Sequence, residues 1–182
     1  MLTIPNLFTL LRVIMTPFIL LELSRGHYMT GGWLFGGAAF TDVIDGGLAR
    51  RFGSESKVGQ YFDPIADKLL LTSIYIGLAM GGAVPVWVVV VVLARDFWIL
   101  GLSGIAFLFT NFRDLKPSLW GKASTFVQIM AAVAVMAARA YDFNGFSILA
   151  DWLLGAVIVL AGISAADYGL RGVSYLRVTR GR

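Results

Sequence analysis

The sequence predicts an all-α integral membrane protein with six transmembrane helices and a short amphipathic segment at the N-terminus. Hydrophobic residues make up 58% of its 182 residues and charged residues only 14%, about half the charged fraction of a typical soluble domain. The mean hydropathy is +0.78. Six segments approach the roughly 20 apolar residues that a helix needs to cross a bilayer. This length suits a single membrane domain that covers residues 1–182.

Charged and helix-breaking residues separate the six segments. The first covers residues 6–23, where Pro17 is expected to kink the helix and the part before it to lie in the membrane interface. The next segments cover residues 30–50, 65–80, 84–109, 119–138 and 148–168. A stretch of 26 uncharged residues lies between Lys68 and Arg95. It is too long for one span, and we expect it to break at the residues Gly81-Gly82-Ala83-Val84-Pro85.

The basic residues predict the orientation of these helices. Twelve of the fifteen Lys and Arg residues fall on the side that both termini share with the loops after the second and fourth helices. Basic loops stay in the cytoplasm, so we expect both termini in the cytoplasm and the protein in a bacterial inner membrane. The net charge of +4 then indicates loops that face anionic lipid headgroups and not nucleic acid. With no cysteine, disulfides and thiolate chemistry are excluded.

Four aspartates are predicted near the cytoplasmic ends of the second and third helices. Asp42 and Asp45 are three residues apart, and Asp63 and Asp67 are four apart, so each pair shares one helix face. Acidic groups at the membrane are costly unless they are paired or bound to a cation. Hard divalent cations prefer such oxygen ligands. The alternatives are ion pairs with neighbouring basic residues, or the ion pathway of a transporter.

The same region resembles a known family. It contains the pattern Asp42-x2-Asp45-Gly46-x2-Ala49-Arg50-x8-Gly59-x3-Asp63-x3-Asp67, which is similar to the signature of the CDP-alcohol phosphatidyltransferases. The N-terminal pattern Ile4-Pro5-Asn6-x2-Thr9-x2-Arg12 also resembles the start of that family. The resemblance implies that the hydroxyl of an alcohol attacks the β-phosphorus of CDP-diacylglycerol and that CMP leaves.

The resemblance also implies a role for each residue of the pattern. Asp42, Asp45 and Asp63 would hold two divalent ions, Mg²⁺ or Mn²⁺. Asp67 would complete the metal site and act as the general base. The residues expected to bind the cytidine diphosphate are Asn6, Gly46, Ala49, Arg50 and Gly59.

The acceptor alcohol is expected at Arg95, Lys116 and Lys122. Around Arg95 and Lys122 the chain resembles phosphatidylglycerophosphate synthases of the family, while the stretch 115–122 resembles cardiolipin synthases of the eukaryotic type. Ser103 stands where many phosphatidylglycerophosphate synthases have a second arginine, which favours phosphatidylglycerol over glycerol 3-phosphate as acceptor. Inositol phosphate and serine stay open as further acceptors. The alternatives are an interhelical or Asp96 ion pair for Arg95, and ordinary loop charge for the two lysines.

Two other functions stay open from the residues alone. An aspartate-rich membrane prenyltransferase also uses magnesium and a pyrophosphate, although its aspartates are spaced differently. A small ion transporter with an acidic site would carry out no group transfer and gives no reason for Arg50 and Gly59 at their spacings. The sequence also allows a homodimer.

Overall fold

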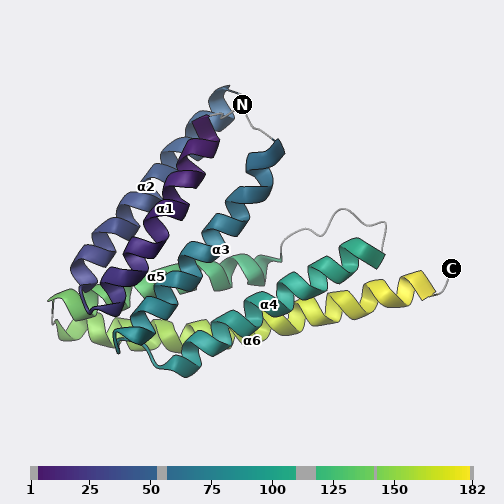
Figure 1. Cartoon of the computed structure of the whole chain (residues 1–182). Helices are drawn as coiled ribbons and strands as arrows, with labels where there is room; N and C mark the ends of the chain where they lie inside the picture. Colours follow the sequence, from purple (N-terminus) through teal and green to yellow (C-terminus); the bar gives the residue numbers. More distant parts are fainter. Residues whose placement is uncertain (1–3, 53–56, 110–117, 142, 181–182) are drawn as a thin grey trace. The chain divides into compact units, whose positions relative to one another are not determined.

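The computed structural model describes residues 4–52, 57–109, 118–141 and 143–180, with side chains for residues 10–41, 65–102, 118–141 and 143–170. Within these residues all regular structure is α-helical, in six helices that match the six predicted segments (Figure 1). The helices are α1 (Ile4–Ser24), α2 (Tyr28–Phe52), α3 (Lys57–Met80), α4 (Val86–Phe109), α5 (Leu119–Tyr141) and α6 (Asn144–Arg180).

Three helices differ from the segments that the sequence predicts. α3 begins at Lys57, eight residues before the predicted start at residue 65. α1 is assigned as one helix through Pro17, so the amphipathic N-terminal segment is not a separate element. A proline removes one backbone hydrogen bond, and this loss does not end the helix here. α6 runs to Arg180, twelve residues past the predicted end at residue 168, because the prediction counted only the apolar part and polar residues continue the helix.

The described helices fall into two compact units, and each unit is described by itself. The first consists of Met1–Val86 and Val135–Ser147, and the second of Trp87–Ala134 and Ile148–Arg182. The first unit therefore contains α1, α2, α3, the end of α5 and the start of α6, while the second contains most of α4, α5 and α6.

In the first unit, α1 packs against both α2 and α3 (Figure 1). The packing is tightest around Leu23, which is fully buried. A Cβ atom at Gly31 of α2 would lie 2.5 Å from Cδ2 of Leu23, and one at Gly77 of α3 would lie 2.9 Å from its Cβ. Both distances are too short for real atoms, so these two glycines allow the helices to approach α1 as closely as they do. Gly32 and Gly36 have open space beside them instead.

The turn between α3 and α4 confirms the predicted break after Met80. Its backbone carbonyls accept hydrogen bonds from two other parts of the first unit. The hydroxyl of Tyr28 donates to the carbonyl of Gly81, and the guanidinium of Arg139 donates to that of Gly82 at 3.4 Å. The turn is therefore fixed by side chains from α2 and α5 as well as by its own backbone.

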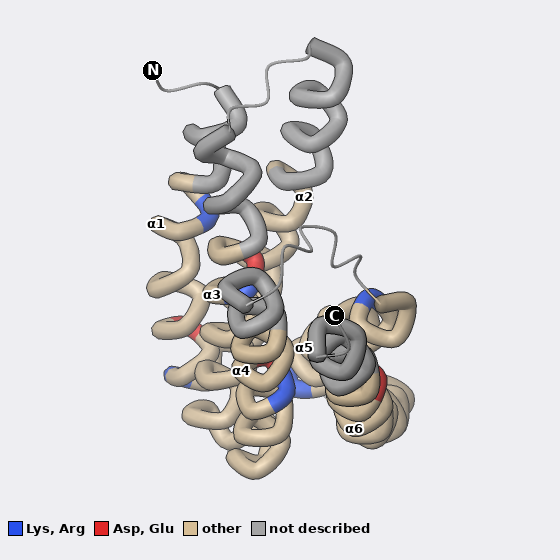
Figure 2. The backbone as a smooth tube through the Cα atoms, turned by 90° about the vertical axis from the view of Figure 1, so that its right-hand side faces the viewer, with Lys and Arg blue, Asp and Glu red and all other residues tan. Residues whose placement is uncertain are grey.

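The described surface is consistent with association with a membrane. By length and composition, Leu119–Tyr141 and Asn144–Leu170 could each cross a bilayer. Large apolar side chains are exposed on helices of both units, for example Trp33 at 72% and Trp152 at 77%. Charged residues are sparse along the described helices, as Figure 2 shows. Large exposed apolar surfaces of this kind mark membrane or protein contacts.

Candidate active site

The aspartate pattern lies on α2 and α3. Asp42 and Asp45 are part of α2, and Asp63 and Asp67 are part of α3, so each pair lies on one face of its helix as predicted. The side chains of Asp42, Asp45 and Asp63 lie outside the described residues. The same holds for the side chains of the residues expected to bind the nucleotide, which are Asn6, Gly46, Ala49, Arg50 and Gly59.

Of the four expected metal ligands, Asp67 is the one whose side chain the structure describes. Its carboxylate forms an ion pair with the guanidinium of Arg12 on α1. The side chain of Arg12 is 4% exposed, while that of Asp67 is 57% exposed. The hydroxyl of Thr16 donates to the backbone carbonyl of Arg12 at 2.8 Å, one turn further along α1. A buried cation on α1 therefore contacts one side of a carboxylate whose other side is accessible.

The fit of a divalent cation depends on the chemistry of these residues. Four carboxylates are hard oxygen donors of the type that Mg²⁺ and Mn²⁺ prefer. More than half of the Asp67 side chain is exposed, so a ligand can reach it. Among the side chains that the structure describes, no three acidic or histidine residues form a metal-binding group. The metal site therefore stays a prediction that rests on the donor set.

Arg95 is placed on α4 in the second unit, where its guanidinium connects three helices. Its Nη1 donates to the carboxylate of Asp96 at 2.6 Å, and its Nη2 donates at 3.1 Å to the carbonyl of Gly121 on α5 and to the hydroxyl of Ser164 on α6. Arg95 is only 6% exposed. Its Nε is buried without a hydrogen-bond partner among the described residues. The interhelical contact and the Asp96 ion pair considered from the sequence are both present.

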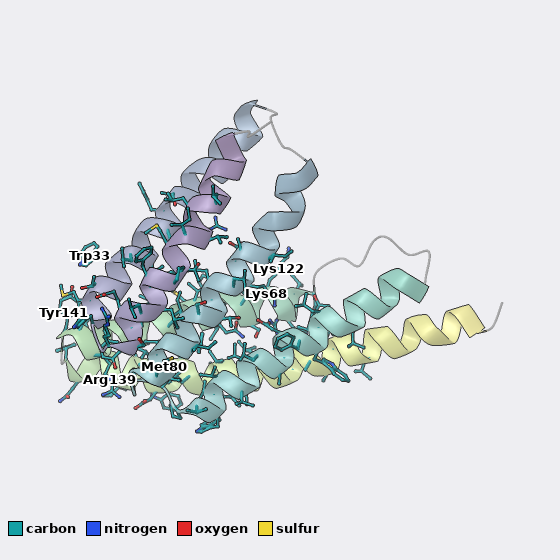
Figure 3. All side chains as sticks on the ribbon, in the orientation of Figure 1. Trp33, Lys68, Met80, Lys122, Arg139 and Tyr141 are labelled. Carbon is teal, nitrogen blue, oxygen red and sulfur yellow. The ribbon has the colours of Figure 1, made fainter. Side chains whose placement is uncertain are left out.

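Lys122 lies on the first turn of α5 with an exposed side chain, and Figure 3 labels it there. Its backbone N–H donates to the carbonyl of Ser118 at 3.1 Å. Lys116, which is expected to act with it, lies outside the described residues. Ser118 itself is bound to Asp167 and Tyr168 of α6, two residues that the sequence analysis did not single out.

Some residues of the site were not expected from the sequence, and they differ in whether a sequence pattern contains them. Arg12 ends the N-terminal pattern quoted above, so its position gave a signal, although its contact with Asp67 could not be predicted from spacing. Asp167 and Tyr168 belong to no pattern in the sequence. Their partner Ser118 is 49 and 50 residues away in the chain, and only the fold brings them together.

The sequence profile of the CDP-alcohol phosphatidyltransferases matches residues 2–163. The chain belongs to this family. The match covers most of both units and decides against the prenyltransferase and the transporter. It identifies the protein as a transferase of phospholipid biosynthesis that moves a phosphatidyl group from CDP-diacylglycerol to an alcohol.

Relatives with three different names are similar to the chain. A probable phosphatidylglycerophosphate synthase of Mycobacterium tuberculosis is 35% identical over 96% of this chain and 85% of the relative. The CDP-diacylglycerol–glycerol-3-phosphate 3-phosphatidyltransferase of Bacillus subtilis is 30% identical over 92% and 94%. A probable cardiolipin synthase (CMP-forming) of Drosophila melanogaster is 34% identical over 70% of this chain, but the match spans only 44% of that longer protein.

Proposed function

We propose that the enzyme transfers the phosphatidyl group of CDP-diacylglycerol to a glycerol-type alcohol, either phosphatidylglycerol or glycerol 3-phosphate, and releases CMP. The observation that carries this proposal is the complete aspartate pattern on α2 and α3 within a family match that runs from residue 2 to residue 163. Both acceptors present a glycerol hydroxyl beside a phosphate, and the relatives named above include enzymes for each. Ser103 favours the diester, phosphatidylglycerol.

In the proposed reaction, the acceptor hydroxyl oxygen forms a bond to the β-phosphorus of CDP-diacylglycerol. The bond from that phosphorus to the oxygen of CMP breaks, and CMP leaves with the electron pair. The carboxylate of Asp67 takes the proton of the hydroxyl as a general base. Asn6, Gly46, Ala49, Arg50 and Gly59 bind the cytidine diphosphate.

Asp42, Asp45, Asp63 and Asp67 would hold two divalent ions, Mg²⁺ or Mn²⁺. When bound, the ions neutralise charge on the diphosphate and polarise the phosphoryl group. Arg12 contacts Asp67 on its buried side. This contact holds the carboxylate on α3, and more than half of the side chain is exposed.

Arg95, Lys116 and Lys122 would bind the phosphate of the acceptor. The buried Nε of Arg95 supports this role because it lacks a partner among the described residues, and an unsatisfied buried donor is costly until a ligand oxygen binds it. Lys122 supports it because its side chain is exposed at the start of α5. Arginine and lysine are the usual partners of phosphate oxygens.

We further propose that all six helices span the membrane, with both termini and the aspartate-bearing ends of α2 and α3 in the cytoplasm, in a bacterial inner membrane. The exposed apolar side chains on helices of both units support this arrangement, as does the placement of twelve of the fifteen basic residues on one side. The family match includes parts of both units, which supports a single family domain over residues 1–182.

The function is tested by comparing acceptors with purified, reconstituted enzyme. CDP-diacylglycerol and Mg²⁺ are supplied with glycerol 3-phosphate, phosphatidylglycerol, inositol phosphate or serine in separate reactions, and CMP release is measured beside the mass of the lipid product. We expect a phosphatidyl product with one of the two glycerol-type acceptors. Product with inositol phosphate or serine alone would refute the acceptor class, and the Asp42→Asn variant controls for non-enzymatic release.

A further inference from the structure

Ser118, at the start of α5, donates two hydrogen bonds to α6. The backbone N–H of Ser118 donates to the phenolic oxygen of Tyr168 at 3.2 Å. Its hydroxyl donates to the carboxylate of Asp167. Ser118 is only 1% exposed, so water cannot replace either partner. Two consecutive residues of α6 therefore satisfy one buried residue that directly precedes α5.

Ser118 occupies the N-cap of α5, because its carbonyl accepts the hydrogen bond of the Lys122 N–H at 3.1 Å. A serine at this position commonly caps the helix by accepting a hydrogen bond from an N–H of the first turn. Here the hydroxyl hydrogen is donated to another helix. Helix capping alone therefore does not account for the Asp167 contact, which instead ties the first turn of α5 to α6.

Gly121 allows α6 to come this close. A Cβ atom at Gly121 would lie 3.2 Å from a ring carbon of Tyr168 and 3.3 Å from its hydroxyl oxygen, closer than side chains ordinarily pack. The carbonyl of Gly121 accepts the hydrogen bond from Arg95. The first turn of α5 is thus held from α6 on one side and from α4 on another. We call the group Ser118, Gly121, Asp167 and Tyr168 the α5 latch.

Lys122 belongs to the turn that the latch fixes. Its backbone N–H is bound to Ser118, while its side chain is exposed. The latch therefore sets the starting point and direction of the lysine side chain without contacting its ammonium group. A shift of this turn would move the lysine side chain relative to the phosphate that it is proposed to bind, so the support of the turn matters for acceptor binding.

We propose that Asp167 and Tyr168 are positioning residues for the phosphate-bearing acceptor, acting through Ser118 on the turn that carries Lys122. This inference rests on the proposed function and deepens it, because it explains how the enzyme holds an acceptor phosphate. Neither residue touches the reacting atoms. Loss of the latch weakens acceptor binding and leaves the nucleotide substrate and the chemical step unaffected.

The test separates the KM values of the two substrates. Asp167→Ala and Ser118→Ala each remove the same hydrogen bond, and each is expected to raise the KM for the glycerol-type acceptor about tenfold, the effect of one lost hydrogen bond to a charged group. The KM for CDP-diacylglycerol and kcat stay near wild type. The double variant is expected to raise the acceptor KM by less than the two single effects combined, because both changes remove the Ser118–Asp167 hydrogen bond. Asp151→Ala, on an exposed residue of α6, is the matched control.

The Asp167→Asn variant tests whether the acceptor KM depends on the hydrogen bond of Asp167 or on its negative charge. Its amide oxygen still accepts a hydrogen bond from the Ser118 hydroxyl, so the acceptor KM is expected within about twofold of wild type. Equal increases in both KM values, or an unchanged acceptor KM in Asp167→Ala, would overturn the latch as a positioning device. If Asp167→Ala does not fold, Ser118→Ala decides by the same measurement. A wild-type enzyme that uses neither glycerol-type acceptor would instead count against the proposed function.

Discussion

Replacement of Arg12 by methionine removes the cation that contacts Asp67 and keeps most of the apolar stem in place. The free energy at stake lies between that of an exposed ion pair, at most about 1 kcal/mol, and that of a broken buried pair, about 3–5 kcal/mol. Arg12 is 4% exposed and Asp67 57% exposed, so we take a value of about 2 kcal/mol. In a protein of this size that free energy lowers the Tm by about 4–8 °C.

Thermal unfolding of the purified protein in detergent with EDTA measures this effect without a contribution from divalent ions. Arg25→Met is the matched control, because the Arg25 side chain is 58% exposed and its nearest carboxylate oxygen, on Glu22, is 4.0 Å away. Its Tm should stay within about 1 °C of wild type. Arg12→Met in an Asp67→Asn background should cost less than in wild type. If Arg12→Met lowers the Tm no more than Arg25→Met does, the ion pair does not stabilise α1 against α3.

Three further predictions concern the reaction and the topology. Asp42→Asn or addition of EDTA should abolish most activity, because an amide replaces a carboxylate ligand poorly; full activity in EDTA would exclude the metal mechanism. Asp67→Asn should lower kcat by roughly 10²–10⁴-fold. CDP-diacylglycerol affinity in the same variant should be kept if Asp67 acts mainly as the base and should fall if it acts mainly as a metal ligand, and near-normal turnover would remove Asp67 from the mechanism. Cysteines introduced as Ser54→Cys and Asn144→Cys should react with an impermeant thiol reagent from opposite sides of the membrane, and reaction from one side would refute six spans.

The helices could be predicted from the sequence because their signals are local. Long apolar segments and the run Gly81-Gly82-Ala83-Val84-Pro85 give the six helices and the break after Met80, since turn residues act on their own backbone. The helix ends do not follow from apolar length alone. α6 extends past residue 168 because helix formation continues through polar residues, whereas the prediction followed apolar length alone.

The candidate site could be predicted only in part. The aspartates of α2 and α3 lie at helical spacings that indicate shared faces, so the donor set follows from the sequence. The partner of Asp67 does not, because Arg12 is 55 residues away in the chain and its burial results from packing. The contacts of Ser118 with Asp167 and Tyr168 join helices through single hydrogen bonds, which leave no periodic pattern in a sequence.

The close packing around Leu23 limits how this sequence can change over evolution. Gly31 of α2 and Gly77 of α3 lie so close to this leucine that a Cβ atom at either position would clash with it. A larger residue at Gly31 would meet the end of the Leu23 side chain, which a smaller residue at position 23 would relieve. A larger residue at Gly77 would meet the Cβ of Leu23 and the backbone of Leu20, which a smaller side chain at position 23 does not remove. Positions 23 and 31 should therefore vary together among homologues, whichever alcohol each enzyme uses. Position 77 should stay glycine, whereas Gly32 and Gly36, which have open space beside them, should accept alanine independently.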